Sequence, residues 1–424
     1  MSDGATAAAT PRVSIASIGS GGVGVARLDG RVVFVPRSAP GDEVEVTLDA
    51  AADDARFRTA RLRHVVTPGP DRVAPACAHY TGDDCGGCQL QHLSPDAQVD
   101  AKAGIIRDAF ERIAKRPLAA LPEVRRGPSV WRYRRSLSLH FRPVGRGGWR
   151  AGLNVYHAPG TVFSLTDCPI TREPVVAALH AVVGAGRHLP AWDGLRITAR
   201  ETAAGIALVV EGAERWADED AHALLAAVPT LSAIWWHAHR GRRRLVADRR
   251  PSAEPDASFA QVNTEVASML RTHLIERVLG HAPRTIIDAY AGAGDTAIPL
   301  ARSGVRVTAI ELDAEASRWC GAQLPHGSTA VTARTEDALP RALPADVVIV
   351  NPPRDGLAAS VTRALDAAAL STRAICYVSC NPATLARDAA RMPRWRVAHI
   401  LAFDMFPQTA HVETVCEFHP EATP

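Results

Sequence analysis

The first part of the chain alternates apolar and polar residues in short runs that Gly and Pro interrupt. One run is Val32-Val33-Phe34-Val35, and a turn signal, Pro40-Gly41-Asp42, follows it closely. Short alternating strands with frequent turns predict a small β-barrel. We therefore expect a barrel domain over residues 11–66, with a disordered tail before it at residues 1–10.

The middle of the chain has a mixed pattern. After a linker at 67–70, residues 94–116 repeat apolar side chains at helical spacing, namely Val99, Ile105, Ile106, Phe110 and Ile113. From about residue 131 the pattern is mostly strand-like, and it ends at a second linker near residue 250. We assign residues 67–93 and 117–250 to a central domain that is mostly β.

The pattern changes again beyond residue 255. Apolar runs typical of buried strands now alternate with helical segments, and these runs are Thr285–Ile287, Val305–Ile310, Val347–Val350 and Ile375–Val378. Such alternation predicts a parallel sheet with helices on both faces, which is an α/β fold. We assign residues 94–116 and 255–424 to this domain.

Composition narrows the compartment and the chemistry. Residues 1–11 lack the basic and apolar regions of a signal peptide, and no stretch approaches the length of a membrane span. We expect a cytoplasmic protein with no membrane partner, in which eight cysteines indicate metal binding or catalysis more than disulfides. The net charge is only +3, and lysine occurs only at positions 102 and 115, so the many arginines reflect coding bias.

Cys380 has the surroundings of a nucleophile. It follows the apolar run 374–378, and Pro382 begins a sequence of helical type directly after it. A cysteine between a strand end and a helix N-terminus lies where α/β sheets bind ligands, and the helix dipole favours its thiolate. The alternative is a small, buried and inert cysteine.

A glycine-bearing turn indicates a nucleoside site. Asp288 ends an apolar run and precedes Gly292-Ala293-Gly294, while Glu311 ends the next apolar run 23 residues after Asp288. Glycines let the backbone approach a ligand, and an acid at the second strand end suits ribose hydroxyls. The turn resembles that of class I S-adenosylmethionine-dependent methyltransferases. Asn351-Pro352-Pro353 stiffens another strand exit, and the same tripeptide occurs in methyltransferases of exocyclic amines.

Jointly, the motifs resemble those of the RNA uracil-C5 methyltransferase family, in its iron–sulfur rRNA branch with an N-terminal TRAM domain. The matches are Gly24-Val25-Ala26-Arg27, Pro40-Gly41-Asp42, Cys85-Gly86-Gly87-Cys88-Gln89, Phe259-Ala260-Gln261-Val262-Asn263, Ser379-Cys380-Asn381-Pro382 and His411-Val412-Glu413-Thr414. They span nearly the whole chain. The resemblance implies an OB-like TRAM barrel at 11–66, a central iron–sulfur and RNA-binding domain, and a Rossmann-like methyltransferase domain.

The resemblance also implies a chemistry. The Cys380 thiolate adds to C6 of uracil, C5 takes the methyl group, and Glu413 removes the C5 proton so that Cys380 can leave. A strand through His411-Val412-Glu413 would place Glu413 and His411 on one face. For S-adenosylmethionine, the resemblance implies contacts from Gln261, Tyr290, Asp295, Glu311 and Asn351. Asp337 follows the next short strand, where it would either meet the adenine or lie in a solvated loop. Two positions depart from the family: Asn351 stands where Asp is usual, and Asp295 where Asn or Thr is frequent.

Four cysteines have the spacing of a metal site. Cys77-x7-Cys85-x2-Cys88 is followed, after 79 residues, by Cys168-Pro169. Four thiolates suit either tetrahedral zinc or a [4Fe–4S] cluster, and spacing alone does not choose between them. The family resemblance implies the [4Fe–4S] cluster. We expect Cys320, Cys376 and Cys416 to be buried and inert.

We expect the protein to be a monomer whose partner is RNA. Ribosomal RNA is the first expectation and tRNA the second. Trp131-Arg132-Tyr133-Arg134-Arg135 mixes aromatic and cationic side chains, which suits base stacking and phosphate binding or an ordinary strand with an arginine face. Two alternatives to uracil methylation remain. One is an exocyclic-amine methyltransferase that uses Asn351-Pro352-Pro353 and needs neither Cys380 nor Glu413. The other is a non-catalytic iron–sulfur RNA-binding protein.

Overall fold

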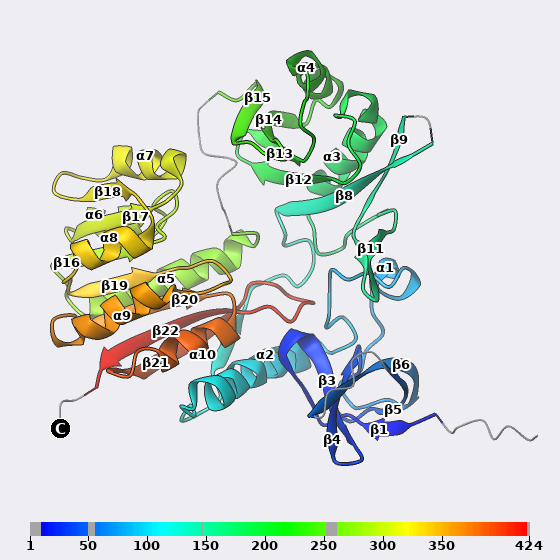
Figure 1. Cartoon of the computed structure of the whole chain (residues 1–424), viewed down its shortest axis with the longest axis horizontal. Coiled ribbons are helices and arrows are strands. Elements are labelled where there is room, and N and C mark those ends of the chain that lie inside the picture. Colours follow the sequence, from blue (N-terminus) through cyan, green and yellow to red (C-terminus); the bar gives the residue numbers. More distant parts are fainter. Residues whose placement is uncertain (1–9, 50–55, 146, 252–260, 422–424) are drawn as a thin grey trace, which may run out of the picture.

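A computed structural model describes residues 10–49, 56–145, 147–251 and 261–421. Apart from Thr10, the tail expected at 1–10 lies outside these ranges. The model arranges the chain around three large sheets that follow one another along the sequence (Figure 1). Within the described ranges, no helix has both the length and the apolar character needed to cross a membrane.

The first sheet confirms the strand pattern near the N-terminus. Its strands, in spatial order, are β1 (Arg12–Ser14), β5 (Glu43–Leu48), β6 (Phe57–Thr67), β4 (Arg31–Pro36), β3 (Val23–Leu28) and β2 (Ser17–Ile18). Alternate residues point inward, so that Val33, Val35, Val44 and Val46 share one small core. The curled sheet has the form of an OB-like barrel (Figure 1).

A buried acid fastens this barrel to the next segment. Asp42 accepts hydrogen bonds from the backbone N–H of Ala39 at 2.6 Å and of Gly69 at 2.8 Å. Its carboxylate also pairs with Arg72 at 2.6 Å. Burial acts to raise the pKa of Asp42. The hydrogen bonds from Arg72, Gly69 and Ala39 outweigh burial and hold this pKa below its usual value. The turn at Pro40-Gly41-Asp42 therefore connects the barrel to the segment that leads into residues 77–90. We call residues 77–90, which carry Cys77, Cys85 and Cys88, the cysteine loop.

The central sheet is mostly antiparallel. Its order is β15 (Arg243–Asp248), β14 (Leu231–His237), β13 (Gly205–Glu211), β12 (Leu195–Thr202), β8 (Ser136–Val144) and β9 (Gly148–Gly152). Helices α3 (Glu173–Gly184) and α4 (Asp218–Ala227) pack on it through one core that also reaches the cysteines. Helix α1 (Ala78–Gly82) and a ribbon of β10 (Asn154–Val155) and β11 (Ala158–Val162) lie beside the cysteine loop.

The third sheet has eight strands. Its order is β18 (Thr329–Thr332), β17 (Arg306–Glu311), β16 (Thr285–Ala289), β19 (Val347–Val350), β20 (Ala374–Ser379), β22 (Glu413–Pro420), β21 (Trp395–Asp404) and β7 (Glu123–Arg126). The strands from β18 to β20 are parallel, as the alternating pattern predicts, whereas β22 runs antiparallel to both its neighbours. Strand β7 pairs with β21 although it falls inside the range 117–250 that we assigned to the central domain.

Helices cover both faces of this sheet. One face carries α5 (Thr264–Gly280), α6 (Ala297–Arg302) and α7 (Ala314–Gln323). The other carries α2 (Pro95–Ala109), its π-helical extension Phe110–Ala114, α8 (Thr335–Ala342), α9 (Ala359–Ala367) and α10 (Pro382–Ala390). The predicted α/β architecture is thus confirmed, and it places the ends of β16, β17, β19 and β20 at one edge.

Candidate active site

Cys380 and Glu413 face each other where β20 ends and β22 begins. The antiparallel register pairs Ser379 with Thr414, so the next opposed pair is Cys380 and Glu413. The chain thus brings its last strand back beside the strand of the candidate nucleophile (Figure 1). His411, by contrast, precedes β22, so the strand expected through 411–415 begins only at Glu413.

The residues after Cys380 fix its backbone. The Asn381 side chain caps α10 by accepting a hydrogen bond from Ala383 N at 3.1 Å, and Pro382 takes the first helical position. Asn381 N in turn donates to Ser379 Oγ at 3.1 Å. Burial raises the pKa of the half-buried Cys380 thiol, and the Glu413 charge adds to this, while Arg354 opposes it. Desolvation therefore outweighs the stabilisation of the thiolate that we expect from the helix N-terminus.

Glu413 is a buried carboxyl group poised near neutrality. Only 4% of the residue is exposed, and burial raises its pKa to about 8. A hydrogen bond with Gln261 and the positive charge of Arg354 act in the opposite direction. A group with such a pKa can both hold and release a proton under physiological conditions.

Arg354 is the functional residue that sequence reasoning missed. Its positive charge acts on both Cys380 and Glu413 and opposes the effect of burial on the pKa of each. Its backbone carbonyl accepts from Asn381 Nδ2 at 3.2 Å and from Thr384 Oγ1 at 3.3 Å. The signal available in the sequence was its place directly after Pro352-Pro353, at a strand exit.

The glycine turn lies two strands away. Tyr290 has φ +64° and Gly294 has φ +93°, and a Cβ on Gly294 would come within 2.6 Å of the Cys320 sulfur. Glu311 accepts hydrogen bonds from Gly292 N at 2.8 Å and from Asp313 N at 2.7 Å. Its carboxylate thus shapes the turn and retains lone pairs for a further donor.

Asp288, the acid before the turn, is buried with one carboxylate oxygen unpartnered. The atom is Oδ2, and only 2% of the residue is exposed. Burial raises the Asp288 pKa to about 7, and the nearby charge of Glu311 adds to the effect. An unpartnered buried oxygen under a glycine turn fits a site that is completed by a polar ligand.

Three of the predicted cofactor residues are exposed, unlike the buried Asp288 and Glu413. Asp295 is exposed, and its carboxylate accepts from Arg271 Nη1 at 3.0 Å. Asp337 is exposed in the first turn of α8. Asn351 is exposed, and its backbone N–H donates to Ala289 O at 3.2 Å. The structure therefore brings together Cys380, Glu413 and Gln261, with the turn at Tyr290 nearby.

The four predicted metal-ligating cysteines line one cavity of about 180 Å³. All four thiols are buried and free of disulfides: Cys77, Cys85, Cys88 and Cys168. Gly87 N donates to Cys85 Sγ at 3.4 Å and Thr171 Oγ1 to Cys168 Sγ at 3.3 Å. Burial raises the pKa of Cys85 to about 11 and of Cys88 to about 12.

An arginine also lines this cavity. Arg134 has a buried Nε with no hydrogen-bond partner, and its charge acts on Cys168. A buried donor without an acceptor, next to four thiols, fits an anionic metal–thiolate centre.

The aromatic and arginine run before β8 is largely structural. Tyr133 is buried and donates to Pro407 O at 2.9 Å. Arg132 makes a two-pronged ion pair with Asp167 at 2.8 and 2.7 Å. The buried Tyr133 ring cannot stack on a base in this arrangement, so the stacking hypothesis is wrong for that residue.

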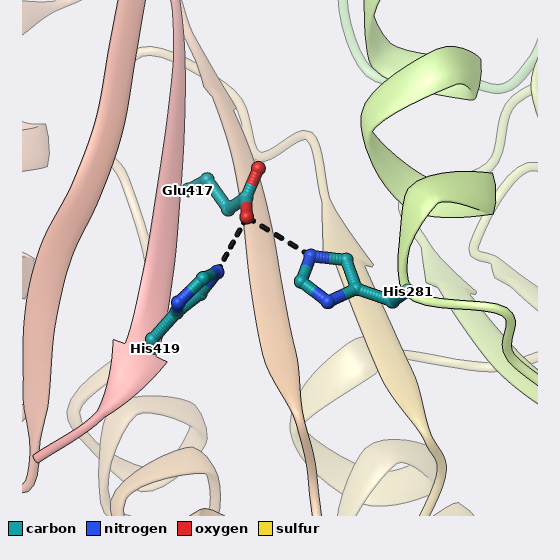
Figure 2. Close-up of side chains that lie close together, drawn as sticks. All are labelled: His281, Glu417 and His419. Carbon is teal, nitrogen blue, oxygen red and sulfur yellow. Dashed lines mark hydrogen bonds and ion pairs between the residues drawn. The ribbon is translucent and has the colours of Figure 1, made fainter. Parts of the chain in front are cut away.

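A second polar cluster lies far along β22 from Cys380. His281 and His419 both contact Glu417 Oε1, at 2.9 and 2.5 Å (Figure 2). Arg277 Nε donates to the other oxygen at 2.6 Å. Although the His281, Glu417 and His419 ligand atoms lie within 4.8 Å of one another, the carboxylate already has a cationic partner. We interpret the cluster as an anchor between the end of α5 and the sheet.

Comparisons with known proteins agree with this layout. The family described as tRNA (Uracil-5-)-methyltransferase matches residues 334–418, and the TRAM domain matches residues 8–56. The 23S rRNA (uracil(1939)-C(5))-methyltransferase RlmD of Thiobacillus denitrificans is 31% identical, over 96% of this chain and 99% of that protein. An uncharacterised RNA methyltransferase of Thermosynechococcus vestitus is 32% identical, over 96% and 97%.

A solved structure is similar over almost the whole chain. It is the Pyrococcus abyssi tRNA (uracil-54, C5)-methyltransferase in complex with S-adenosyl-L-homocysteine. The TM-score is 0.68 at 24% identity, with 96% of this chain and 100% of that chain covered. At this identity the likeness shows the fold.

Proposed function

This chain belongs to the RNA uracil-C5 methyltransferase family, and we propose that it transfers a methyl group from S-adenosylmethionine to C5 of a uracil in 23S rRNA. The observation that carries the proposal is the proximity of Cys380, which directly follows β20, to Glu413, the first residue of β22. The Thiobacillus denitrificans relative is named for methylation of 23S rRNA, which favours rRNA over tRNA. Action as a monomer in the cytoplasm stays a prediction.

The proposed reaction needs a nucleophile and a base in one place. Cys380, as its thiolate, forms a bond to C6 of uracil, and the electrons of the C5–C6 double bond move toward O4. The enolate C5 attacks the methyl group, and S-adenosylhomocysteine leaves. Glu413 then takes the proton from C5, the double bond re-forms, and the bond from C6 to Cys380 breaks.

The neighbours of this pair have supporting roles. Arg354, whose charge favours the ionised forms of both Cys380 and Glu413, stabilises the thiolate before attack. Gln261 orients Glu413 through their hydrogen bond. The target base reaches the site only after it leaves its stack, as in other enzymes that modify a base.

S-Adenosylmethionine fits the edge formed by β16, β17 and β19. Glu311 would receive the ribose hydroxyls, and the turn at Tyr290 would pack against the nucleoside. Asp288 offers its unpartnered oxygen to this site. Gln261, Asp295, Asp337 and Asn351 remain proposed cofactor residues.

Cys77, Cys85, Cys88 and Cys168 would hold a [4Fe–4S] cluster. The cavity between the four thiols, the N–H and O–H donors to sulfur and the unpartnered Arg134 Nε support an anionic metal–thiolate centre, and the family resemblance favours [4Fe–4S] over zinc. When bound, such a cluster would tie the cysteine loop to the central domain.

RNA that contains 5-fluorouridine provides the test. Fluorine at C5 cannot leave as a proton does, so the adduct with Cys380 should persist as a stable complex on a denaturing gel. The Cys380→Ala protein should form no adduct and no 5-methyluridine, yet should bind S-adenosylhomocysteine as the wild type does. Turnover by Cys380→Ala, with methylation on an exocyclic amine, would instead support the alternative based on Asn351-Pro352-Pro353.

A second experiment identifies the RNA. Mass-spectrometric mapping of 5-methyluridine in 23S rRNA and tRNA from a strain lacking this chain should show one missing methyl group in 23S rRNA. Loss from tRNA alone would contradict the proposed substrate.

A further inference from the structure

The segment between β21 and β22, residues 405–412, leads directly into Glu413, and we call it the base loop. The base loop forms hydrogen bonds with α2 and with the cysteine loop. It also accepts one from Tyr133 of the central domain, whose hydroxyl donates to Pro407 O at 2.9 Å. These contacts join parts of the chain that are distant in sequence. They therefore link the site of the cysteines to the side chain that we propose as the base.

Helix α2 contributes a reciprocal amide pair. Gln98 Nε2 donates to Gln408 Oε1 at 3.0 Å, while Gln408 N donates to Gln98 Oε1 at 2.9 Å. Both side chains are buried, with 3% exposed in each residue. The second proton of Gln98 Nε2 is used by Leu93 O at 3.0 Å. Gln98 is thus fully committed to holding the base loop in one position.

The cysteine loop grips the same residue from the other side. Directly after Cys88, Gln89 N and Leu90 N both donate to Gln408 O, at 3.2 and 3.0 Å. The Gln89 side chain accepts from Ala410 N at 3.4 Å. Any change in the path of the chain at Cys88 must therefore move, or release, the base loop.

Helix α2 also contributes a buried ion pair beside the base loop. Lys102 on α2 is fully buried and pairs with Asp404, the last residue of β21. Its ammonium group also donates to Phe406 O at 3.1 Å. A compact ammonium with several donors can serve both acceptors, which a planar guanidinium would do less well. In a chain whose basic residues are almost all arginine, lysine occupies this position.

The backbone of the base loop is strained where these contacts meet. Gln408 has φ +70°, in the left-handed region that non-glycine residues rarely adopt. Such strain persists when the surrounding contacts determine it, and it is frequent at functional sites. Here the contacts of Gln98 and of the cysteine loop hold it.

We propose that Gln98 is a positioning residue that couples the cysteine loop to Glu413 through the backbone of Gln408, so that a filled cysteine site is required for the proton-removal step. The proposal rests on the proposed function for the role of Glu413. Cofactor binding and thiol attack do not depend on the coupling, because the contacts converge on the base loop alone.

The kinetic test separates attack from proton removal. Gln98→Met keeps the side-chain length and removes both hydrogen bonds to Gln408. With 5-fluorouridine RNA, where no proton is removed, this variant should form the adduct at the wild-type rate. In single turnovers on unmodified 23S rRNA it should accumulate the covalent complex and release product at least tenfold more slowly. The affinity for S-adenosylhomocysteine should not change.

Gln408→Gly is the matched control. Glycine accepts φ +70° and keeps both backbone groups that Gln98, Gln89 and Leu90 contact. It should release product within about twofold of the wild type. If Gln98→Met does not fold, Gln89→Ala provides a second test, because it removes the hydrogen bond from Ala410 N to the half-buried Gln89 side chain. This variant should also slow product release. Release at the wild-type rate by every variant that removes a contact would overturn the coupling.

Hydrogen exchange tests the coupling without any activity. The backbone amides of residues 404–413 should exchange faster in the Cys88→Ser protein, and in wild type stripped of iron, than in iron-loaded wild type. Peptides from α4, which touches neither loop, serve as the reference. Unchanged protection of 404–413 would overturn the proposal. A wild type that is inactive on RNA but shows the exchange effect would sink the proposed function and leave the coupling supported.

Discussion

The side-chain amide of Asn381 donates a hydrogen bond to the backbone carbonyl oxygen of Arg354, 3.2 Å away. The same side chain caps α10 through Ala383 N. One residue therefore fixes the helix that follows Cys380 and also the loop that brings Arg354 to the thiol. Sequence motifs that look separate are joined here by a single side chain.

Replacing Asn381 should separate these two roles. Asn381→Ala should lower stability by about 1 kcal/mol through loss of the cap, and it should also slow adduct formation because the Arg354 carbonyl keeps only its hydrogen bond from Thr384. Asn381→Ser restores a capping oxygen but not the amide donor. We expect Asn381→Ser to regain the stability, measured by urea denaturation, without regaining the rate of attack on 5-fluorouridine RNA. Full recovery of that rate would show that the hydrogen bond to the Arg354 carbonyl is unimportant.

Replacing Glu413 should stop the reaction after methyl transfer. Glu413→Gln is neutral at every pH and cannot take the C5 proton, so a covalent RNA complex should accumulate in single turnovers on unmodified 23S rRNA. Attack on 5-fluorouridine RNA should continue. Product release at the wild-type rate would mean that the base lies elsewhere.

The pH dependence of product release should report the same group. Burial raises the Glu413 pKa to about 8, and only the ionised carboxylate accepts a proton. The rate of release from the covalent complex should therefore rise with pH and level off above about 8. A rate that is flat between pH 6 and 9 would contradict this assignment. The measurement should follow the covalent complex directly, because Cys380 must also ionise before the attack.

The metal prediction concerns content and colour. Protein purified without oxygen should be brown and contain iron rather than zinc. Cys85→Ser or Cys88→Ser should lose the iron, while Cys376→Ser, at a buried cysteine outside the cavity, should keep it. One equivalent of zinc in protein handled without oxygen would overturn the cluster assignment.

The anchor at Glu417 should give stability that depends on pH (Figure 2). Hydrogen bonds from Arg277, His419 and His281 lower its pKa to about 2, although burial alone would raise it. Because the folded-state pKa lies below the unfolded value, the contribution is complete above about pH 4.5 and is lost as pH falls toward 2. Glu417→Gln should cost about 2 kcal/mol at pH 7 in urea denaturation, and the exposed-site control Glu421→Gln should cost almost nothing. Equal stabilities at pH 7 would contradict this role.

Local pattern was enough for much of the fold and for the reactive residues. Alternating and continuous apolar runs predict the barrel strands and the parallel strands, because burial on one face or on both leaves a period in the sequence. The sequence motifs also pointed to Cys380, Glu413 and Gln261, which the structure brings together. The family resemblance to RNA uracil-C5 methyltransferases is confirmed by relatives that align along the whole chain.

Tertiary structure alone decided how these residues are held. Gln98 meets Gln408 across 310 positions and Lys102 meets Asp404 across 302, so no local period records either contact. Strand β7 joins the third sheet because β21 offers backbone groups for pairing and Val124 packs into the core of this sheet, although Glu123–Arg126 has no strand pattern long enough to predict it. Likewise, the pKa of Cys380 follows from burial beside Glu413 rather than from its place before a helix. The pattern of apolar and polar residues determines which helices and strands form. Desolvation and long-range hydrogen bonds determine the pKa values and the positions of the side chains at the ends of those helices and strands.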